Sequence, residues 1–203
     1  MTESPRKRGR PASIDTQSAM HAVVELFRDK GYAAVSLDDL SETTGLSRPS
    51  LFRAFGNKLS MYVSAMNAFG QDAAEVALPK LEAEGDLEAA LTNFFDAMLG
   101  IYYRNSDVAP GCLIFGTAPA HVDEAEIKAR LNFGIDQVDS RMRQRMEKAF
   151  PNCESSRIET AARMASNTLI AFSARAKAGA SQQALSEIGA ESAQTIGLLL
   201  RSA

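Results

Sequence analysis

The side chains with the clearest chemistry lie between Ser36 and Lys58, in the stretch SLDDLSETTGLSRPSLFRAFGNK. Arg48 and Arg53 fall on the polar side of a short helical pattern, and arginine is the side chain that most often reads guanine in the DNA major groove. Ser47 directly precedes that pattern, where a hydroxyl and free backbone N–H groups can bind a phosphate. The stretch therefore predicts a DNA-binding surface. Its predicted contacts are Ser36, Ser47, Arg48, Ser50, Phe52, Arg53 and Lys58.

Two short helices joined by a tight turn are needed to position these side chains. Leu37 and Leu40 share one face of the first helical pattern, and Gly45 follows it, where a helix end favours a residue that tolerates positive φ. Leu51 and Phe55 give the second pattern an inward face at i, i+4 spacing. The result is a helix-turn-helix whose second helix fits the major groove. The side chains then available for base edges are Arg48, Ser50 and Arg53, with Phe52 placed for a thymine methyl or a sugar.

This stretch resembles the DNA-binding segment of the TetR family over about residues 10–70. The matching positions are Gly31-Tyr32, Ser36, Leu40, Thr44-Gly45-Leu46-Ser47, Leu51-Phe52, Ala54-Phe55 and Lys58. The sequence departs from the common family pattern at Thr44, Pro49, Phe52 and Ala54. Phe52 replaces a tyrosine whose hydroxyl usually reaches a phosphate, so the resemblance implies one fewer phosphate contact. It also implies that Lys58 meets a phosphate.

The N-terminal residues 1–13, MTESPRKRGRPAS, carry Arg6, Lys7, Arg8 and Arg10 among Pro, Gly and Ser. This composition cannot form a core, so we expect a disordered basic arm. One interpretation is a solvated tail. The other is an arm that enters the DNA minor groove, because Arg8-Gly9-Arg10-Pro11 resembles the core of an AT-hook.

Composition indicates a helical protein whose charge is unevenly distributed. The 203 residues have a net charge of −3, with basic side chains in excess over residues 1–58 and acidic ones in excess over residues 59–203. A basic end on an acidic body favours binding DNA by that end. No apolar run approaches the ~20 residues of a membrane span, and no signal-peptide pattern is present, so we expect a soluble, cytoplasmic protein. Cys112 and Cys153 are too few for a disulfide framework.

Apolar periodicity predicts an all-α fold of about nine helices, with the helix-turn-helix head joined by the fourth helix to a C-terminal bundle. Asp15 is the expected N-cap of the first helix, and Asp123 with Glu126 forms a capping-box-like pair for the seventh. Beyond the helix-turn-helix, helices are predicted at 15–31, from 58 to about 77, and at 86–104, 112–118, 123–149, 154–178 and 181–201. The expected domains are the arm (1–13), the DNA-binding domain (14–58) and an effector-binding and dimerisation domain (59–203).

The family resemblance implies a homodimer on a palindromic operator, with a small effector inside the C-terminal bundle. The last two predicted helices, rich in Ala, Gly and Ser, are the expected dimer interface, although packing within one chain would use the same residues. Side chains that could line an effector pocket are Phe94, Phe95, Met98, Tyr102, Cys112, Phe115, Phe133 and Met164. The alternative for them is plain core. Cys112, in the first turn of a predicted helix, is also a candidate sensor of oxidants or electrophiles, since a helix dipole lowers a thiol pKa; the alternative is a buried small hydrophobe.

Signatures of enzymes are missing from the sequence. It has no GxSxG, Walker loop, HExxH or Cys-x-x-Cys motif, and His21 and His121 are isolated. We therefore expect no catalysis, metal or cofactor, and a transcriptional regulator, in most family members a repressor. The rival interpretations are an architectural DNA-binding protein without an effector, and an enzyme or carrier that has kept the helix-turn-helix.

Overall fold

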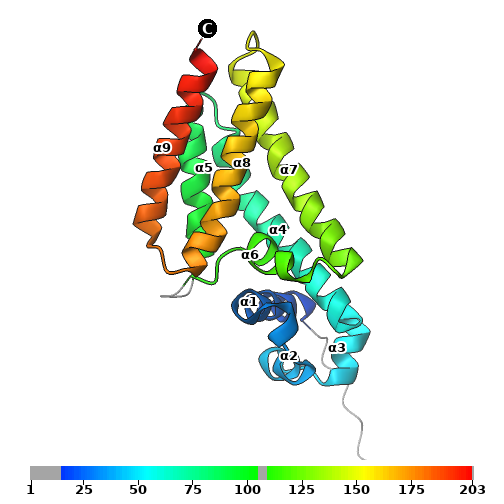
Figure 1. The fold of residues 1–203 in the computed structure, drawn as a ribbon. Coiled ribbons are helices and arrows are strands. Elements are labelled where there is room, and N and C mark those ends of the chain that lie inside the picture. The colour runs from blue at the N-terminus through cyan, green and yellow to red at the C-terminus, as the bar shows by residue number, and fades with distance from the viewer. Residues whose placement is uncertain (1–14, 105–108, 203) are drawn as a thin grey trace, which may run out of the picture.

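The computed structural model describes residues 15–104 and 109–202, which contain nine α-helices, one short 3-10 helix and no strand. This confirms the all-α prediction. A head of three helices lies below an upright helical body, and α4 runs from one into the other (Figure 1). The head contains α1 (Thr16–Ala34), α2 (Leu37–Thr44) and α3 (Arg48–Phe55), followed by α4 (Lys58–Leu81). The body contains α5 (Leu87–Tyr102), α6 (Leu113–Thr117), the 3-10 helix η1 (Ala118–His121), α7 (Ala125–Ala149), α8 (Ser155–Lys177) and α9 (Gln182–Arg201).

Side-chain caps fix the helix starts of the head. Asp15 accepts hydrogen bonds from the backbone N–H groups of Gln17 and Ser18, as predicted for an N-cap. Ser36 and Asp39 form a capping box at α2, and Ser47 caps α3. Gly45 ends α2 with φ 68°, a left-handed conformation that glycine adopts at little cost because it has no Cβ.

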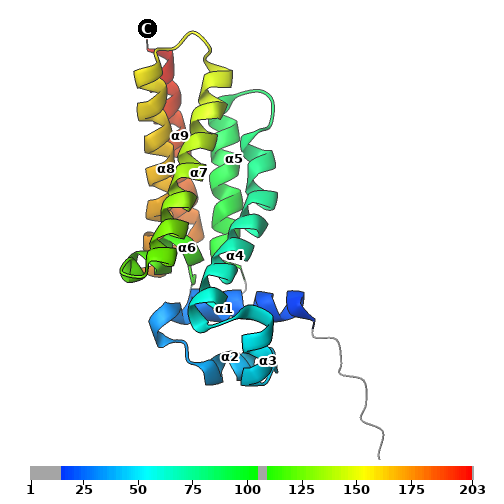
Figure 2. The same ribbon diagram turned by 90° about the vertical axis from the view of Figure 1, so that its right-hand side faces the viewer.

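A continuous apolar core joins the head to the body. Phe27 of α1 packs edge-on against Tyr62 of α4, with ring centroids 5.0 Å apart, and both side chains are fully buried. Within the body, Phe95 of α5 packs against Phe172 of α8 at 5.6 Å. Turned by 90°, the molecule shows the helices of the body standing side by side above the head (Figure 2). The core therefore gives α4 packed neighbours in both parts.

Two helix ends and one helix cap differ from the sequence prediction. We expected α4 to end near Ala77, before Pro79, but it continues to Leu81 because proline in the last turn removes only one backbone donor. The predicted capping pair of α7 was wrong, because α7 follows Glu124 and no side chain caps it. The first helix breaks at Gly31, with φ 75°, and one further turn reaches Ala34.

Two buried arginines tie separate elements together through backbone carbonyls. Arg28 of α1 is 1% exposed and donates to Gly111 O (3.2 and 3.1 Å) and Ile101 O (2.9 Å), while Glu25 pairs with it at 2.8 Å. It therefore joins the head to the segment that links α5 and α6. Arg145 of α7 is the second buried arginine, and its contacts lie at the opposite end of α4.

Arg145 caps the C-terminal end of α4. Its Nε donates to Leu81 O at 2.9 Å, and its Nη2 donates to Gly85 O at 3.1 Å and Ala83 O at 3.4 Å. These carbonyls belong to the last residue of α4 and to the connection that follows, where the helix itself supplies no donors. The far end of α4 is thereby attached to α7.

Candidate nucleic-acid interface and candidate ligand cavity

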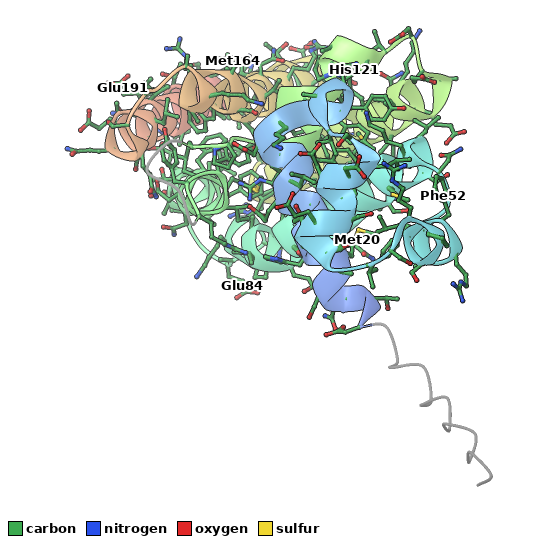
Figure 3. All side chains as sticks on the ribbon, turned by 90° about the horizontal axis from the view of Figure 1, so that it is seen from below. Met20, Phe52, Glu84, His121, Met164 and Glu191 are labelled. Carbon is green, nitrogen blue, oxygen red and sulfur yellow. The ribbon has the colours of Figure 1, made fainter. Side chains whose placement is uncertain are left out.

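The outer face of α3 carries the side chains that the sequence predicts to read DNA. Arg48, Phe52 and Arg53 are exposed, Ser50 is partly exposed, and Leu51 is fully buried beneath them. Viewed from the head end, Phe52 lies at one edge of the molecule and Glu191 of α9 at the opposite edge (Figure 3). A helix preceded by a capped turn, with its polar side exposed, has the shape that enters a major groove.

Arg48 is held by an ion pair across the helix-turn-helix. Its Nε and Nη2 donate to Oδ1 of Asp38 on α2, at 3.0 and 2.5 Å, and this carboxylate raises the pKa of Arg48. Both side chains are more than half exposed, so the pair contributes little stability. Because the pair uses Nε and Nη2, Nη1 stays available for a base edge or a phosphate while Asp38 orients the guanidinium.

Lys58 folds back against α1. Its Nζ donates to Ala33 O at 3.3 Å and lies 4.8 Å from the centre of the Tyr32 ring, and partial burial lowers its pKa. The predicted phosphate contact thus starts from an ammonium that already has an acceptor and an aromatic ring beside it. Tyr32 and Lys58 are separate positions of the motif that resembles the TetR family, and the structure brings their side chains into contact.

Ser36 is also engaged. Its hydroxyl and its backbone N–H both donate to the Asp39 carboxylate, which Lys30 contacts at 2.6 Å. The Lys30 contact and these hydrogen bonds hold the pKa of Asp39 well below its usual range. Ser47 is exposed, and its hydroxyl contacts that of Ser50 at 3.0 Å. The predicted arm residues Arg6, Lys7, Arg8 and Arg10 lie outside the described residues.

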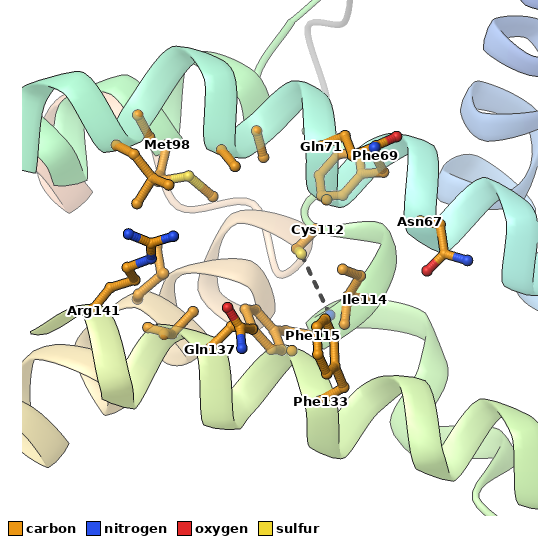
Figure 4. Close-up of a pocket in the computed structure, with 18 of the residues that line it drawn as sticks. Asn67, Phe69, Gln71, Met98, Cys112, Ile114, Phe115, Phe133, Gln137 and Arg141 are labelled. Atoms are coloured by element: carbon orange, nitrogen blue, oxygen red, sulfur yellow. Dashed lines mark hydrogen bonds between the residues drawn. The ribbon is translucent and has the colours of Figure 1, made fainter.

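A cavity of about 560 Å³ lies in the body, between α4 and α7, with α5 and α6 closing its inner side (Figure 4). Its volume falls within the range of small-molecule sites, ~300–1,000 Å³. The aromatic and methionine side chains on its walls are Phe69, Phe94, Met98, Phe115, Phe133 and Met142. The cavity is therefore largely apolar and suited to a small organic molecule.

Five of the eight side chains predicted for an effector pocket line this cavity: Phe94, Met98, Cys112, Phe115 and Phe133. Phe95 and Tyr102 are fully buried in the core and are not among its lining residues. Met164 lies on α8, is 37% exposed and is also outside the cavity wall. Phe133 is 54% exposed.

Sequence reasoning missed the polar lining of the cavity, because it looked only for apolar positions. The polar side chains are Asn67 and Gln71 of α4 and Arg130, Gln137 and Arg141 of α7. Two helix-interior glycines, Gly70 and Gly134, were the available signal, since glycine inside a helix costs stability and usually has a packing reason. Both also line the cavity.

Cys112 is buried at the inner side of the cavity and forms the N-cap of α6. Its Sγ accepts a hydrogen bond from the Phe115 backbone N–H at 3.4 Å (dashed in Figure 4), and its own N–H donates to Ser173 Oγ at 3.0 Å. Burial outweighs these contacts and raises the pKa of the thiol. This direction is opposite to the one expected from a helix dipole, and a protonated thiol is a weak nucleophile.

Two other site types were sought in the described residues. None of the helices described is both long enough and apolar enough to span a membrane. Over residues 15–104 and 109–202, no group of three or more His, Cys, Asp or Glu side chains is arranged to hold a metal ion.

Comparison with known proteins identifies relatives over about half of the chain. Residues 19–65 match the sequence model of the family described as bacterial regulatory proteins, tetR family. The uncharacterized HTH-type transcriptional regulator YezE of Bacillus subtilis is 29% identical over 110 residues, which cover 54% of this chain and 56% of that protein. The HTH-type transcriptional repressor ComR of Escherichia coli is 31% identical over 110 residues, covering 54% of this chain and 52% of that protein. The chain thus spans about half the length of these curated relatives.

A solved structure is similar over nearly the whole chain. It is a cysteine mutant of the TetR family transcriptional regulator CifR, complexed with 26-bp double-strand operator DNA. The TM-score is 0.79 at 21% identity, and the match covers 92% of this chain and 98% of that one. At this identity the likeness shows that the two proteins share a fold, including the way the head is joined to the body.

Proposed function

We propose that the chain is a transcriptional regulator of the TetR family that binds a specific DNA operator; the family-model match over residues 19–65, the regulators similar to about half of the chain and the shared fold support this. A repressor is the simplest form of this proposal, acting in the cytoplasm and released when a small molecule occupies the cavity between α4 and α7. The observation that carries it is the exposed face of α3, with Arg48 and Arg53 beside a turn closed by Gly45. No catalytic role is part of the proposal.

The proposed contacts divide into reading and positioning. Arg48, Ser50 and Arg53 read base edges, and Phe52 packs on a thymine methyl or a sugar. Ser36, Ser47 and Lys58 contact phosphates, together with the arm residues Arg6, Lys7, Arg8 and Arg10. Arg53 has no ion-pair partner among the described residues, so it is the side chain most available for a guanine.

A palindromic operator requires two heads, so the proposal includes a homodimer through α8 and α9. These helices pack against each other at one side of the body (Figure 1). Their outward side chains include Met164, which is 37% exposed, and Leu198, which is 56% exposed. Large apolar side chains that lie exposed beside small residues suit a helix-to-helix contact between copies.

The proposed signal is a bound ligand rather than oxidation of Cys112, because that thiol is buried and its pKa is raised. Mass spectrometry of the native protein after mild treatment with an electrophile checks this choice. We expect Cys112 to stay unmodified. Rapid modification of Cys112, with release of DNA, would favour the alternative of a cysteine sensor.

The test of DNA binding is footprinting on DNA upstream of the protein's own gene, followed by affinity measurements on the protected site. Arg53→Ala should cost about 1–3 kcal/mol on that site and relax specificity at one base pair. Arg143→Ala removes the same charge from an exposed position on α7 and should leave binding unchanged. If Arg53→Ala weakens specific and random DNA equally, Arg53 contacts only phosphate. Failure of the wild-type protein to protect any site would remove the proposed function.

A further inference from the structure

The charges on the cavity wall are all of one sign. Arg130 and Arg141 are the only charged side chains among its lining residues, and no Asp, Glu, Lys or His of the described chain lines it. Eleven residues separate the two arginines on α7, which places them on one face of the helix, about 16 Å apart along its axis. An apolar cavity with a positive charge near each end favours a ligand that carries negative charge.

The two arginines differ in how far their charge is compensated. Arg141 pairs with Glu82 at 3.2 Å, and both side chains are substantially exposed. Arg130 has no carboxylate partner among the described residues. Its Nε donates to Asn67 Oδ1 at 2.6 Å and its Nη2 to Met66 O at 3.3 Å, whereas Nη1 is buried without an acceptor in the described chain. Burial lowers the pKa of this guanidinium, which is the expected effect of an uncompensated charge.

The space around Arg130 is made by two glycines. A Cβ on Gly70 of α4 would lie 2.6 Å from its Nη2, and a Cβ on Gly134 of α7 would lie 3.4 Å from its Nη1. The Phe133 ring covers the group from the outside, with its centroid 5.3 Å from Arg130 Cζ. The guanidinium therefore occupies a defined site at the wall of an apolar cavity, and an unused donor there costs free energy until an acceptor arrives.

We propose that the cavity binds a carboxylate with a predominantly apolar body, whose carboxylate group pairs with Arg130; this inference rests on the proposed role of the cavity as the regulatory site. The planar guanidinium matches a carboxylate with two parallel hydrogen bonds. The apolar body extends along α7 toward Met98 and Met142, over the aromatic walls. The cavity lining has no Asp or Glu that could pair with a cationic ligand, so cations are disfavoured.

Binding of the anion also acts on α4. Asn67 and the Met66 carbonyl, which now accept from Arg130, belong to the part of α4 nearer the head. A carboxylate that accepts from Nη1 and Nη2 together shares Nη2 with the Met66 carbonyl, so a bound ligand weakens this contact between α7 and α4. This gives the ligand different contacts in two positions of α4, which is the requirement for shifting an equilibrium between them.

The test measures binding by calorimetry on the purified full-length protein without DNA. Two carboxylates with different bodies, decanoate and 1-naphthylacetate, are each compared with the corresponding alcohol and amine. We expect at least one carboxylate to bind about tenfold to a hundredfold more tightly than its alcohol, and the amines to bind most weakly. If neither carboxylate binds, or if an alcohol or amine binds as tightly, the proposal is wrong.

Matched variants locate the anion. Arg130→Gln should abolish the preference for carboxylate over alcohol, whereas Arg143→Gln, the same change at an exposed position of α7 outside the cavity lining, should retain it. A preference that survives in Arg130→Gln overturns the assignment, provided that circular dichroism shows the variant folded; an unfolded Arg130→Gln is replaced by Arg130→Lys, which keeps the charge and should lose most of the preference.

The same measurements separate this inference from the proposed function. Carboxylate binding that depends on Arg130, in a protein that protects no operator, contradicts the regulatory proposal and leaves the ligand class intact. Operator binding that is intact in a protein indifferent to carboxylates contradicts the ligand class alone.

Discussion

At the far end of α4 a buried Arg145 donates to three backbone carbonyls, whereas nearer the head Arg130 reaches α4 through one exposed amide and one long hydrogen bond. Both arginines project from α7, so one helix holds the other at two places with different strength. Arg145 fixes the end of α4 because one of its acceptors, the carbonyl of the buried Leu81, would be left unpaired if the contact broke. A guanidinium with an unused nitrogen can exchange partners at little cost. The comparison separates a structural tie from an adjustable one.

The largest effect is expected at the fixed end. Arg145→Met keeps the aliphatic stem but leaves three carbonyls without their donor, and should lower the free energy of unfolding by about 2–4 kcal/mol. Urea denaturation followed by circular dichroism measures the loss. Arg141→Met, one turn away and exposed, is the control and should cost less than about 1 kcal/mol. Similar losses in the two variants would show that the Arg145 contacts are not special.

A smaller effect on stability is expected from removing the Tyr62 hydroxyl. This buried group of α4 lies 2.5 Å from the hydroxyl of Thr117 on α6. Tyr62→Phe should cost about 1 kcal/mol at neutral pH. Burial raises the pKa of Tyr62 to about 12, so the folded state keeps this proton more firmly than the unfolded chain, whose tyrosine pKa is about 10. The resulting stability is present in full below pH 10 and is lost as pH rises from about 10 to 12. Between these values Tyr62→Phe should lose less stability than the wild type does, and an equal loss in both would contradict the assignment.

Arg130→Gln should change the free energy of unfolding by less than about 0.5 kcal/mol. The substitution removes two hydrogen bonds, but it also removes a buried nitrogen that has no acceptor in the described chain. The same urea experiment decides. A loss as large as that of Arg145→Met would mean that both contacts with α4 are structural, and the comparison would fail.

The smallest effect is the coupling between Gly70 and Arg130. In the wild type, Gly70→Ala gains helix propensity but pushes a Cβ against the Arg130 guanidinium, so the two effects should nearly cancel. In the Arg130→Gln background the guanidinium is gone, and Gly70→Ala should stabilise the protein by about 0.5 kcal/mol more than in the wild type. A double-mutant cycle from urea denaturation measures this difference, and strict additivity would show that Gly70 has another purpose.

The head could be predicted closely because its signals are local. Ser36, Ser47 and Gly45 are capping and turn residues whose effect reaches only a few positions along the chain, and the structure places each as expected. Leu40 and Leu51 are buried, as the periodicity predicted. The functional assignment of the α3 side chains stays a prediction.

The contacts of the body could not be predicted in the same way, because they join residues far apart in sequence. The helical pattern gives no signal for Arg28, Arg130 or Arg145, because each donates to a backbone carbonyl at least sixty residues away. Nothing in the periodicity reveals which backbone carbonyl a long side chain will reach. The end of α4 was misplaced for the same reason, since Arg145, from α7, supports the turn that contains Pro79.

The attachment of α4 at its far end has a geometric consequence for the head. With 24 residues, α4 is about 36 Å long, and Asn67 lies about 21 Å from its far end at Leu81. If Arg145 makes that end the pivot, α4 acts as a lever, with the proposed ligand site partway along it and Lys58 at its other end. A sideways shift of about 1 Å at Asn67 then becomes about 1.6 Å at Lys58. A small shift of α4 around a bound molecule would therefore be enlarged at the end of α4 that carries the proposed DNA contact.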